Sequence, residues 1–136
     1  MAYVGDVFET AMGLMDELDA EGEALTPDTA EYMLRTPMII NTLIAEFKML
    51  TGERGDWLPV ESIDDMMPAG DTSYQLGALP YGLAAALLVD ENPSAASFYQ
   101  QRYEELRAWY IARAQASTAD IVNLYGGIEY GEFAAW

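Results

Sequence analysis

Apolar residues recur every three or four positions along several stretches of the chain, which is the spacing of an amphipathic α-helix. The first stretch covers residues 4–18, where acidic residues occupy the opposite face. Its apolar positions are Val4, Val7, Phe8, Ala11, Leu14, Met15 and Leu18. A polar connector at 19–26 follows and contains Gly22, a helix breaker. We therefore expect a helix with an acidic outer face and then a turn.

Two Thr-Pro pairs mark the next helix starts. Thr26-Pro27 and Thr36-Pro37 each place a capping hydroxyl before a proline, which suits the first helical turn. The pattern predicts a short helix, TAEYMLR, and then a longer helix over about residues 37–51 that ends at Gly52. The apolar residues of the longer helix are Met38, Ile39, Ile40, Leu43, Ile44, Phe47 and Leu50.

The periodicity is lost in residues 53–71, ERGDWLPVESIDDMMPAGD, where prolines, glycines and acids are mixed. This composition predicts a long exposed loop, with one short extended piece near Val60 to Ile63.

A helix beginning near Thr72 or Ser73 is expected to contain the apolar run Leu79 to Val89. The run is too short to cross a bilayer, which takes about 20 residues. Pro80 suits a first helical turn or a kink. The small residues of the helix let a neighbouring helix approach closely; they are Gly77, Ala78, Gly82, Ala84, Ala85 and Ala86.

The sequence DENP at 90–93 predicts a reversal, because Asn92 can cap a new helix with Pro93 at its first position. That helix is predicted over about 93–116 and to pack antiparallel to the helix near 73–90. One side of it carries Tyr99, Tyr103, Leu106 and Tyr110, which we interpret as core residues. The elements together predict an all-α bundle of four to five helices.

Composition narrows the function. The 136 residues suit one domain, and 23 acids against 6 bases give a net charge of −17. Nine acids precede the first base, Arg35, so the surface repels phosphate backbones and sequence-independent gripping of nucleic acid is excluded. The absence of cysteine removes disulfides, thiolate nucleophiles and thiolate metal sites, and the absence of histidine removes the commonest acid/base group and transition-metal ligand. The first ten residues lack the pattern of a signal peptide, so we expect a soluble chain made inside the cell, without a membrane segment.

Candidate chemistry is weak. Residues 17–28, ELDAEGEALTPD, follow a calcium-loop template poorly, since the first ligand should be Asp and the last a bidentate Glu. Asp64-Asp65 has no motif to supply further ligands, and GGIEYG lacks the lysine of a phosphate-binding loop. We expect neither an enzyme nor a bound cofactor or metal.

The C-terminal residues 120–136 combine three glycines with aromatic and apolar residues. We interpret 1–119 as a helical bundle domain and 120–136 as an extended arm. Two roles stay open for the arm: it folds back on its own bundle, or it buries its rings on another subunit. The candidate anchors are Tyr125, Ile128, Tyr130, Phe133 and Trp136.

The order LPYGLAAALL, DENP, ASFYQQRYEEL and a closing LYGG-type tail ending in an aromatic residue resembles head-to-tail connector (adaptor) proteins of tailed bacteriophages. The resemblance covers about residues 27–136. It implies a helical structural protein of the virion, made in the host cytoplasm, that forms a ring of usually twelve subunits under the portal protein. Such a ring extends the DNA channel and contacts the next neck or tail protein, while DNA passes without specific binding.

Within this resemblance, the acids of the first 34 residues or of the 53–71 loop are expected to line or rim the DNA passage. The candidates are Asp16, Glu17, Asp19, Asp64 and Asp65. Two other classes remain open: a different neck or capsid-associated protein, such as a tail-completion protein or a typically β-rich stopper, and an acidic DNA mimic that inhibits a basic host protein.

Overall fold

The computed structural model describes residues 2–126, with side chains as far as Ala114. The described residues form α1 (Val4–Leu14), the 3-10 turn η1 (Pro27–Thr29), α2 (Ala30–Thr51), α3 (Thr72–Gly77), α4 (Leu79–Leu88) and α5 (Pro93–Gly126). Among the described residues, Tyr3 and Met66 form an isolated β-bridge, and there is no strand. The predicted all-α bundle is therefore confirmed.

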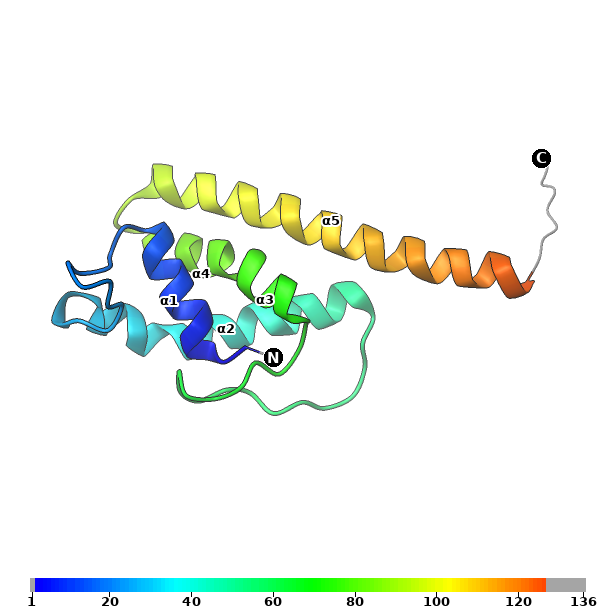
Figure 1. Cartoon of the computed structure of the whole chain (residues 1–136), viewed down its shortest axis with the longest axis horizontal. Helices are drawn as coiled ribbons and strands as arrows, with labels where there is room; N and C mark the ends of the chain where they lie inside the picture. The colour runs from blue at the N-terminus through cyan, green and yellow to red at the C-terminus, as the bar shows by residue number, and fades with distance from the viewer. Residues whose placement is uncertain (1, 127–136) are drawn as a thin grey trace.

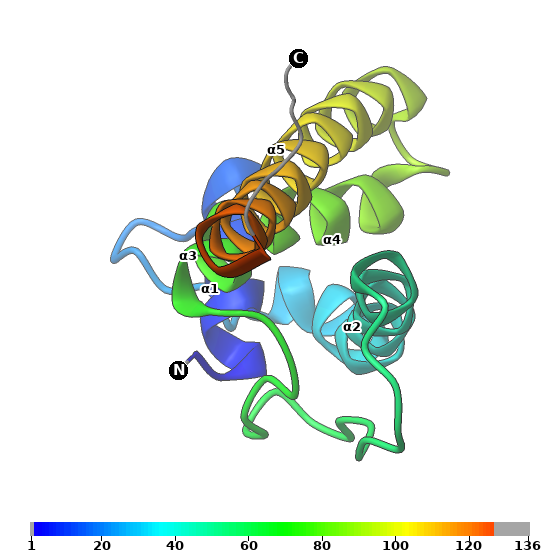
Figure 2. The same ribbon diagram turned by 90° about the vertical axis from the view of Figure 1, so that its right-hand side faces the viewer.

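Helix α4 is the centre of the bundle, with α1, α2 and α5 packed around it (Figures 1 and 2). Its sequence, LPYGLAAALL, has no charge, and all its residues except Tyr81 and Ala86 are buried. A helix that is apolar on every side must be enclosed by other helices. Glycine at position 82 permits this, since a Cβ there would lie 3.2 Å from ring atoms of Tyr103 and 3.3 Å from a methyl of Leu43.

The reversal before α5 is confirmed. The Asn92 side chain accepts a hydrogen bond from the Ala95 amide at 3.2 Å, so it caps α5 as predicted. Helices α4 and α5 then run side by side in opposite directions (Figure 1). The predicted helix from Thr72 to Val89 is divided, because Pro80 lies in the first turn of α4 and the chain breaks its helix at Ala78.

The prediction that Thr36-Pro37 begins a new helix was wrong, because α2 runs through Pro37 without interruption. Its buried residues form one face that crosses the proline, so packing against the core stabilises the helix despite the hydrogen bond that proline cannot donate. The Thr36 hydroxyl also donates to the Tyr32 carbonyl at 2.7 Å. The buried residues of α2 are Tyr32, Thr36, Ile40, Ile44 and Phe47. Met38, one of the apolar residues of the predicted helix, is 66 % exposed.

Helix α1 ends at Leu14 rather than at the predicted residue 18. The Glu17 amide donates to the Met12 carbonyl at 2.8 Å and the Asp16 amide to the Gly13 carbonyl at 3.2 Å, which is the hydrogen-bond pattern of a Schellman motif. Asp16 supplies the left-handed residue of that motif, with φ of +61°. The apolar period of the sequence continues past Leu14, but this local capping geometry ends the helix.

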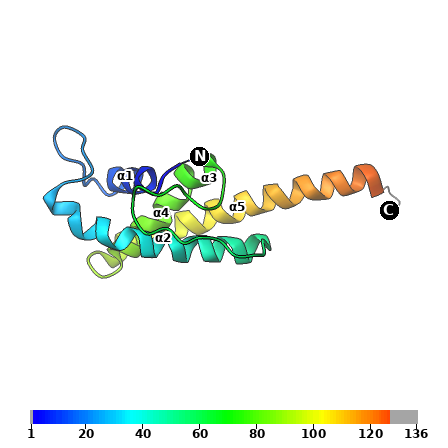
Figure 3. The ribbon, with the colours of Figure 1, turned by 90° about the horizontal axis from the view of Figure 1, so that it is seen from below.

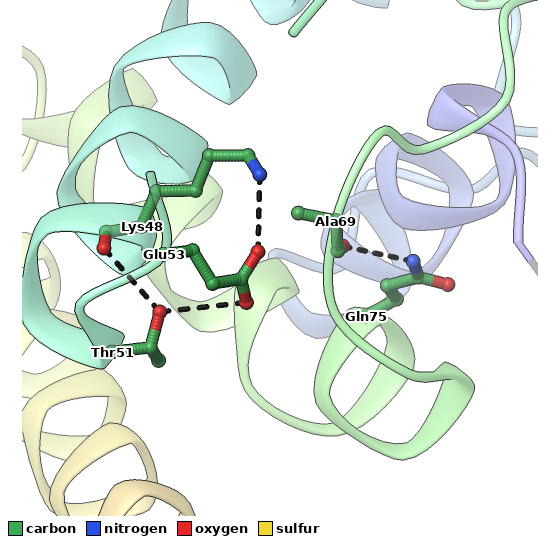
Figure 4. Close-up of polar contacts among 5 residues, drawn as sticks. All are labelled: Lys48, Thr51, Glu53, Ala69 and Gln75. Atoms are coloured by element: carbon green, nitrogen blue, oxygen red, sulfur yellow. Dashed lines mark hydrogen bonds and ion pairs between the residues drawn. The ribbon is translucent and has the colours of Figure 1, made fainter. Parts of the chain in front are cut away.

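The loop at 53–71 is non-helical as predicted, but it is anchored rather than exposed throughout. The Asn41 amide brackets Val60, accepting from its N–H at 2.8 Å and donating to its carbonyl at 2.9 Å. Val60, Met67 and Ala69 are buried. At its start the loop is closed by the Lys48–Glu53 ion pair at 3.1 Å, and further along it is held by Gln75 (Figure 4). Side chains on α2 and α3 thus give the loop hydrogen-bonding partners that a composition-based prediction does not include.

Helix α5 extends to Gly126, beyond the predicted end near residue 116, so the part of the predicted extended arm at 120–126 is helical. The stretch 117–125 contains neither proline nor glycine, and Gly126 is its first breaker. Figures 1 and 3 show that the second half of α5 runs past the rest of the bundle.

Candidate functional site

Three of the predicted channel acids lie in the connector that follows α1, residues 15–29. Asp16 and Glu17 belong to the turn that ends the helix. The Asp19 carboxylate accepts hydrogen bonds from the Glu21 amide at 3.0 Å and from the Glu23 amide at 2.8 Å. Asp19 therefore organises the connector, a role that the sequence interpretation missed although Asp followed closely by glycine is a recognised turn signal.

The other two acids occupy the loop between α2 and α3. The Asp65 carboxylate accepts from the Glu61 amide at 2.7 Å and from the Ser62 amide at 3.1 Å, so it holds a turn. Asp64 is exposed and lines a surface pocket of about 360 Å³ that also includes Ala24 and Leu25. The structure thus places Asp64 beside the connector, while Asp65 is committed to the fold.

Four of the aromatic and apolar anchors predicted in the arm lie outside the described residues; they are Ile128, Tyr130, Phe133 and Trp136. Tyr125 falls within the helical backbone of α5, and its side chain is not among those described.

A polar and aromatic cluster joins α2, α3 and α5. The rings of Phe47, Tyr74 and Tyr110 meet with centroids 4.6 to 5.9 Å apart. The Tyr74 and Tyr103 hydroxyls lie 2.9 Å from each other. This confirms that Tyr103 is core, since it is fully buried, and Tyr110 packs against the same cluster.

An ion pair covers the edge of this cluster. The Arg107 guanidinium donates to the Glu46 carboxylate at 2.8 Å, and it lies 5.2 Å from the centroid of the Tyr103 ring. Burial acts to lower the pKa of Arg107, but Glu46 and Tyr103 together outweigh it and the pKa is raised. The pair fastens the middle of α5 to the last third of α2.

The tyrosines of the interior are hydrogen-bonding groups rather than acid/base groups. Burial raises the pKa of Tyr74 and of Tyr103. The hydrogen bond from Tyr32 to Glu91, 2.7 Å long, and burial raise the pKa of Tyr32 to about 12. Each of these hydroxyls is therefore protonated at neutral pH, where it can donate a hydrogen bond but cannot act as a general base.

The surface feature that stands out is the α5 outer face, which we define as Phe98, Arg102, Trp109 and Arg113. Phe98 and Trp109 are 63 % and 60 % exposed, and the Arg113 guanidinium lies 4.7 Å from the centre of the Trp109 ring. Trp109 and Arg113 also line a shallow groove of about 480 Å³ that reaches the start of α3. Large aromatic residues and arginine are the side chains most enriched at protein-binding hot spots.

The sequence contained a signal for this face that the sequence interpretation did not use. Phe98 and Trp109 are eleven positions apart, and eleven residues make about three turns at 3.6 residues per turn. They therefore share one side of the helix, opposite the buried Tyr103.

A second apolar surface follows the outer side of α2. Leu34 is 75 % exposed and Met49 is 77 % exposed, and with Met38 they lie at helical spacing along that side. Apolar side chains in such a row are typical of a protein-binding surface.

Over residues 2–114, no three acidic side chains come together in a way that could hold a metal ion. No helix in the described part of the chain is both long and apolar enough to cross a membrane. Comparison with protein-family models, with curated proteins and with solved structures finds no match to this chain.

Proposed function

We propose that this chain is a head-to-tail connector (adaptor) subunit of a tailed bacteriophage. In this role it forms a ring, of about twelve subunits by the resemblance of its sequence, between the portal protein and the next neck or tail component. Its function is structural, it uses no cofactor, and it resides in the virion after synthesis in the host cytoplasm. DNA passes through the ring without specific binding.

The observation that carries the proposal is the overhang of α5. Its 34 residues span about 51 Å, whereas the 10 residues of α4, its main neighbour, span about 15 Å. Isolated helical segments are marginally stable in water, so a helix that extends well past its own bundle needs a partner. A subunit whose longest helix runs past the rest of the described bundle is suited to an assembly.

Two further features support a connector over the alternatives. The helical fold disfavours a stopper, because stoppers are typically β-rich. The exposed apolar and aromatic side chains on α2 and α5 favour a protein with several neighbours over a monomeric DNA mimic, whose binding surface should be acidic.

The test is to mix the purified chain with its portal protein and to examine the product by negative-stain electron microscopy. Rings at the portal support the proposal. A chain that never joins the portal but binds a basic host protein as a monomer would overturn it in favour of the DNA mimic.

Removal of residues 124–136 tests the role of the arm in the same assay. Melting near that of the full chain with lost incorporation supports an arm that docks on a neighbouring subunit or on the portal. Loss of thermal stability with intact incorporation would instead show that these residues complete their own core.

The channel role of the acids requires variants that keep the fold intact. Asp19 and Asp65 hold turns, so reversing their charge would confound the result. Lysine at Asp56, Glu61 and Asp64, which are all exposed acids of the 53–71 loop, should slow DNA ejection or packaging by attracting phosphates while the particles assemble normally. Unchanged ejection would place these acids away from the DNA path.

A further inference from the structure

Phe98 and Trp109 of the α5 outer face are exposed, while Arg102 of the same face lies over the Tyr81 ring of α4, 6.0 Å from its centroid. On the opposite side of the helix, Tyr103 is fully buried and the pair Arg107–Glu46 fixes the orientation of α5 about its axis. The fold therefore holds Phe98 and Trp109 outward, and their exposure is a property of the packed bundle rather than of a loose helix.

This face is also electrostatically different from the rest of the chain. Residues 93–114 contain three arginines and two glutamates, within a protein of net charge −17. Arg107 is paired with Glu46, and Arg102 lies 3.5 Å from Glu105. Arg113 makes a cation–π contact with Trp109 and no ion pair with a described residue. Arg113 beside the exposed Trp109 ring thus favours an acidic partner.

The chain itself carries a surface of matching chemistry in its connector, residues 15–29. This segment has no base, and its exposed acids surround two exposed leucines, Leu18 at 40 % and Leu25 at 57 %. Carboxylates can pair with Arg113, and the leucine side chains can cover the ring of Trp109. The acids of the connector are Asp16, Glu17, Asp19, Glu21, Glu23 and Asp28.

Within one molecule the connector can reach only the start of the α5 outer face, because the Tyr99 hydroxyl donates to the Leu14 carbonyl at 2.7 Å. Trp109 and Arg113 lie ten and fourteen residues further along α5, about 15 and 21 Å away. The connector leads into the first residue of α2, Ala30, while Arg107 of α5 contacts Glu46, sixteen residues further along α2. At 1.5 Å per residue these positions are about 24 Å apart. Figures 1 and 3 show the connector at one end of the bundle and the C-terminal part of α5 leaving at the other end.

We propose that Trp109 and Arg113 of the α5 outer face bind the acidic connector of a second copy of this chain. Because the two surfaces differ and these two residues lie away from the connector of their own molecule, the contact is head-to-tail, and repetition closes into a ring or continues as a filament according to the rotation per subunit. The inference deepens the proposed function: closure of the contact into a ring rests on that function. The contact itself forms without portal protein.

The test uses two variants that each remove one surface. The first combines Trp109→Ala with Arg113→Glu, and the second combines Glu21→Lys with Glu23→Lys. These side chains are exposed, and the connector bonds of Asp19 go to the backbone amides of residues 21 and 23, which the substitutions keep. Analytical ultracentrifugation of the full chain should show concentration-dependent association, and each variant alone should associate about tenfold or more weakly.

An equal mixture of the two variants gives the decisive measurement. Each mixed pair retains one intact α5 outer face and one intact connector, so the mixture should form dimers and nothing larger. A contact between two identical surfaces would not be restored by mixing, so a mixture that stays monomeric overturns the proposal. Salt at about 1 M should weaken the wild-type association, since the contact is between exposed charges.

Matched controls place the same charge changes elsewhere. Arg54→Glu and the pair Asp56→Lys with Glu61→Lys alter exposed residues of the loop and should leave association unchanged. If these controls weaken association equally, the change in net charge alone explains the weaker association of the two variants, and the proposal is overturned. Removal of residues 127–136 should also leave association unchanged. If this removal abolishes association, residues 127–136 of another copy, rather than its connector, bind the α5 outer face.

The outcomes separate this inference from the proposed function. A wild-type chain that remains monomeric even at about 1 mM overturns the head-to-tail contact, whether or not it joins the portal. A chain that self-associates as described but never joins the portal keeps the contact and overturns the connector role.

Discussion

Gln75 offers a sharp test of how the fold is held together. Its side chain is fully buried and joins three segments of the chain. The carbonyl oxygen accepts from the Ala2 amide at 3.0 Å, and the amide nitrogen donates to the carbonyls of Ala69 and Gly70 at 3.0 Å each. Figure 4 shows the contact with Ala69. Replacing Gln75 by Glu keeps the size and shape of the side chain but removes its two donors.

The expected loss of stability depends on pH. When the introduced carboxyl is protonated, it can still donate one of the two hydrogen bonds, so the loss is about 1 to 2 kcal/mol. When it is ionised, a buried charge faces two carbonyl oxygens and the loss rises to about 3 kcal/mol or more. Burial thus raises the pKa of this carboxyl in the folded state above its unfolded value of about 4.3. The stability of the variant relative to the wild-type protein is accordingly highest below pH ~4 and falls as the pH rises through the folded-state pKa of this carboxyl.

The assay is urea unfolding followed by circular dichroism at 222 nm, at several values from about pH 4 to pH 8. Gln101→Glu is the matched control, because Gln101 is exposed on α5 and receives the same chemical change. The Gln75→Glu variant should lose stability relative to this control, and the difference should grow with pH. A difference near zero at pH 7 would refute the inference that these hydrogen bonds are formed in a dry interior.

Three further predictions test the core. Leu83→Asp should prevent folding, because an unpaired carboxylate would replace a fully buried side chain of α4; normal melting by circular dichroism would contradict this. Gly82→Val should cost about 1 to 3 kcal/mol in urea unfolding, since a Cβ there already lies 3.2 Å from a ring of α5, whereas Gly77→Ala, with open space, should be tolerated. The pKa of Tyr32 is raised from 10.0 to about 12, so its contribution to stability is complete below pH ~10 and is lost as the pH rises towards 12; Tyr32→Phe should flatten that decline in alkaline melting curves.

The elements with strong local signals were predicted well from the sequence. The charge-free run of α4 and the Asn92 cap each depend on residues close together in the chain, and both are present as expected. The errors arose where distant residues decide. Pro37 stays inside α2 because its helix packs on the core, and the loop at 53–71 is anchored by Asn41 and Gln75, which no local pattern connects to it.

The candidate site was harder to predict for a similar reason. Composition identified the acids, but a carboxylate looks the same in a sequence whether it binds a partner or a backbone amide. Asp19 and Asp65 were expected to face DNA, and both accept two amide hydrogen bonds in turns. The α5 outer face depends on which side of the helix is buried, and the burial of Tyr103 establishes that.

This division of the acids leads to the last prediction. Glu21 and Glu23 have exposed side chains with no hydrogen bond or ion pair to the described residues, and they lie beside Asp19 in a segment without a base. Like charges this close repel one another, which destabilises the fold by a few tenths of a kcal/mol per pair at low salt.

Lysine at both positions should therefore raise the melting temperature slightly at low ionic strength, and the gain should fade as salt screens the charges. If the same variant loses self-association, stability and binding will have moved in opposite directions, which is the behaviour of residues selected for a partner rather than for the fold. A lower melting temperature would instead show that these carboxylates stabilise the connector, and the argument that they are available for a neighbouring subunit would fail.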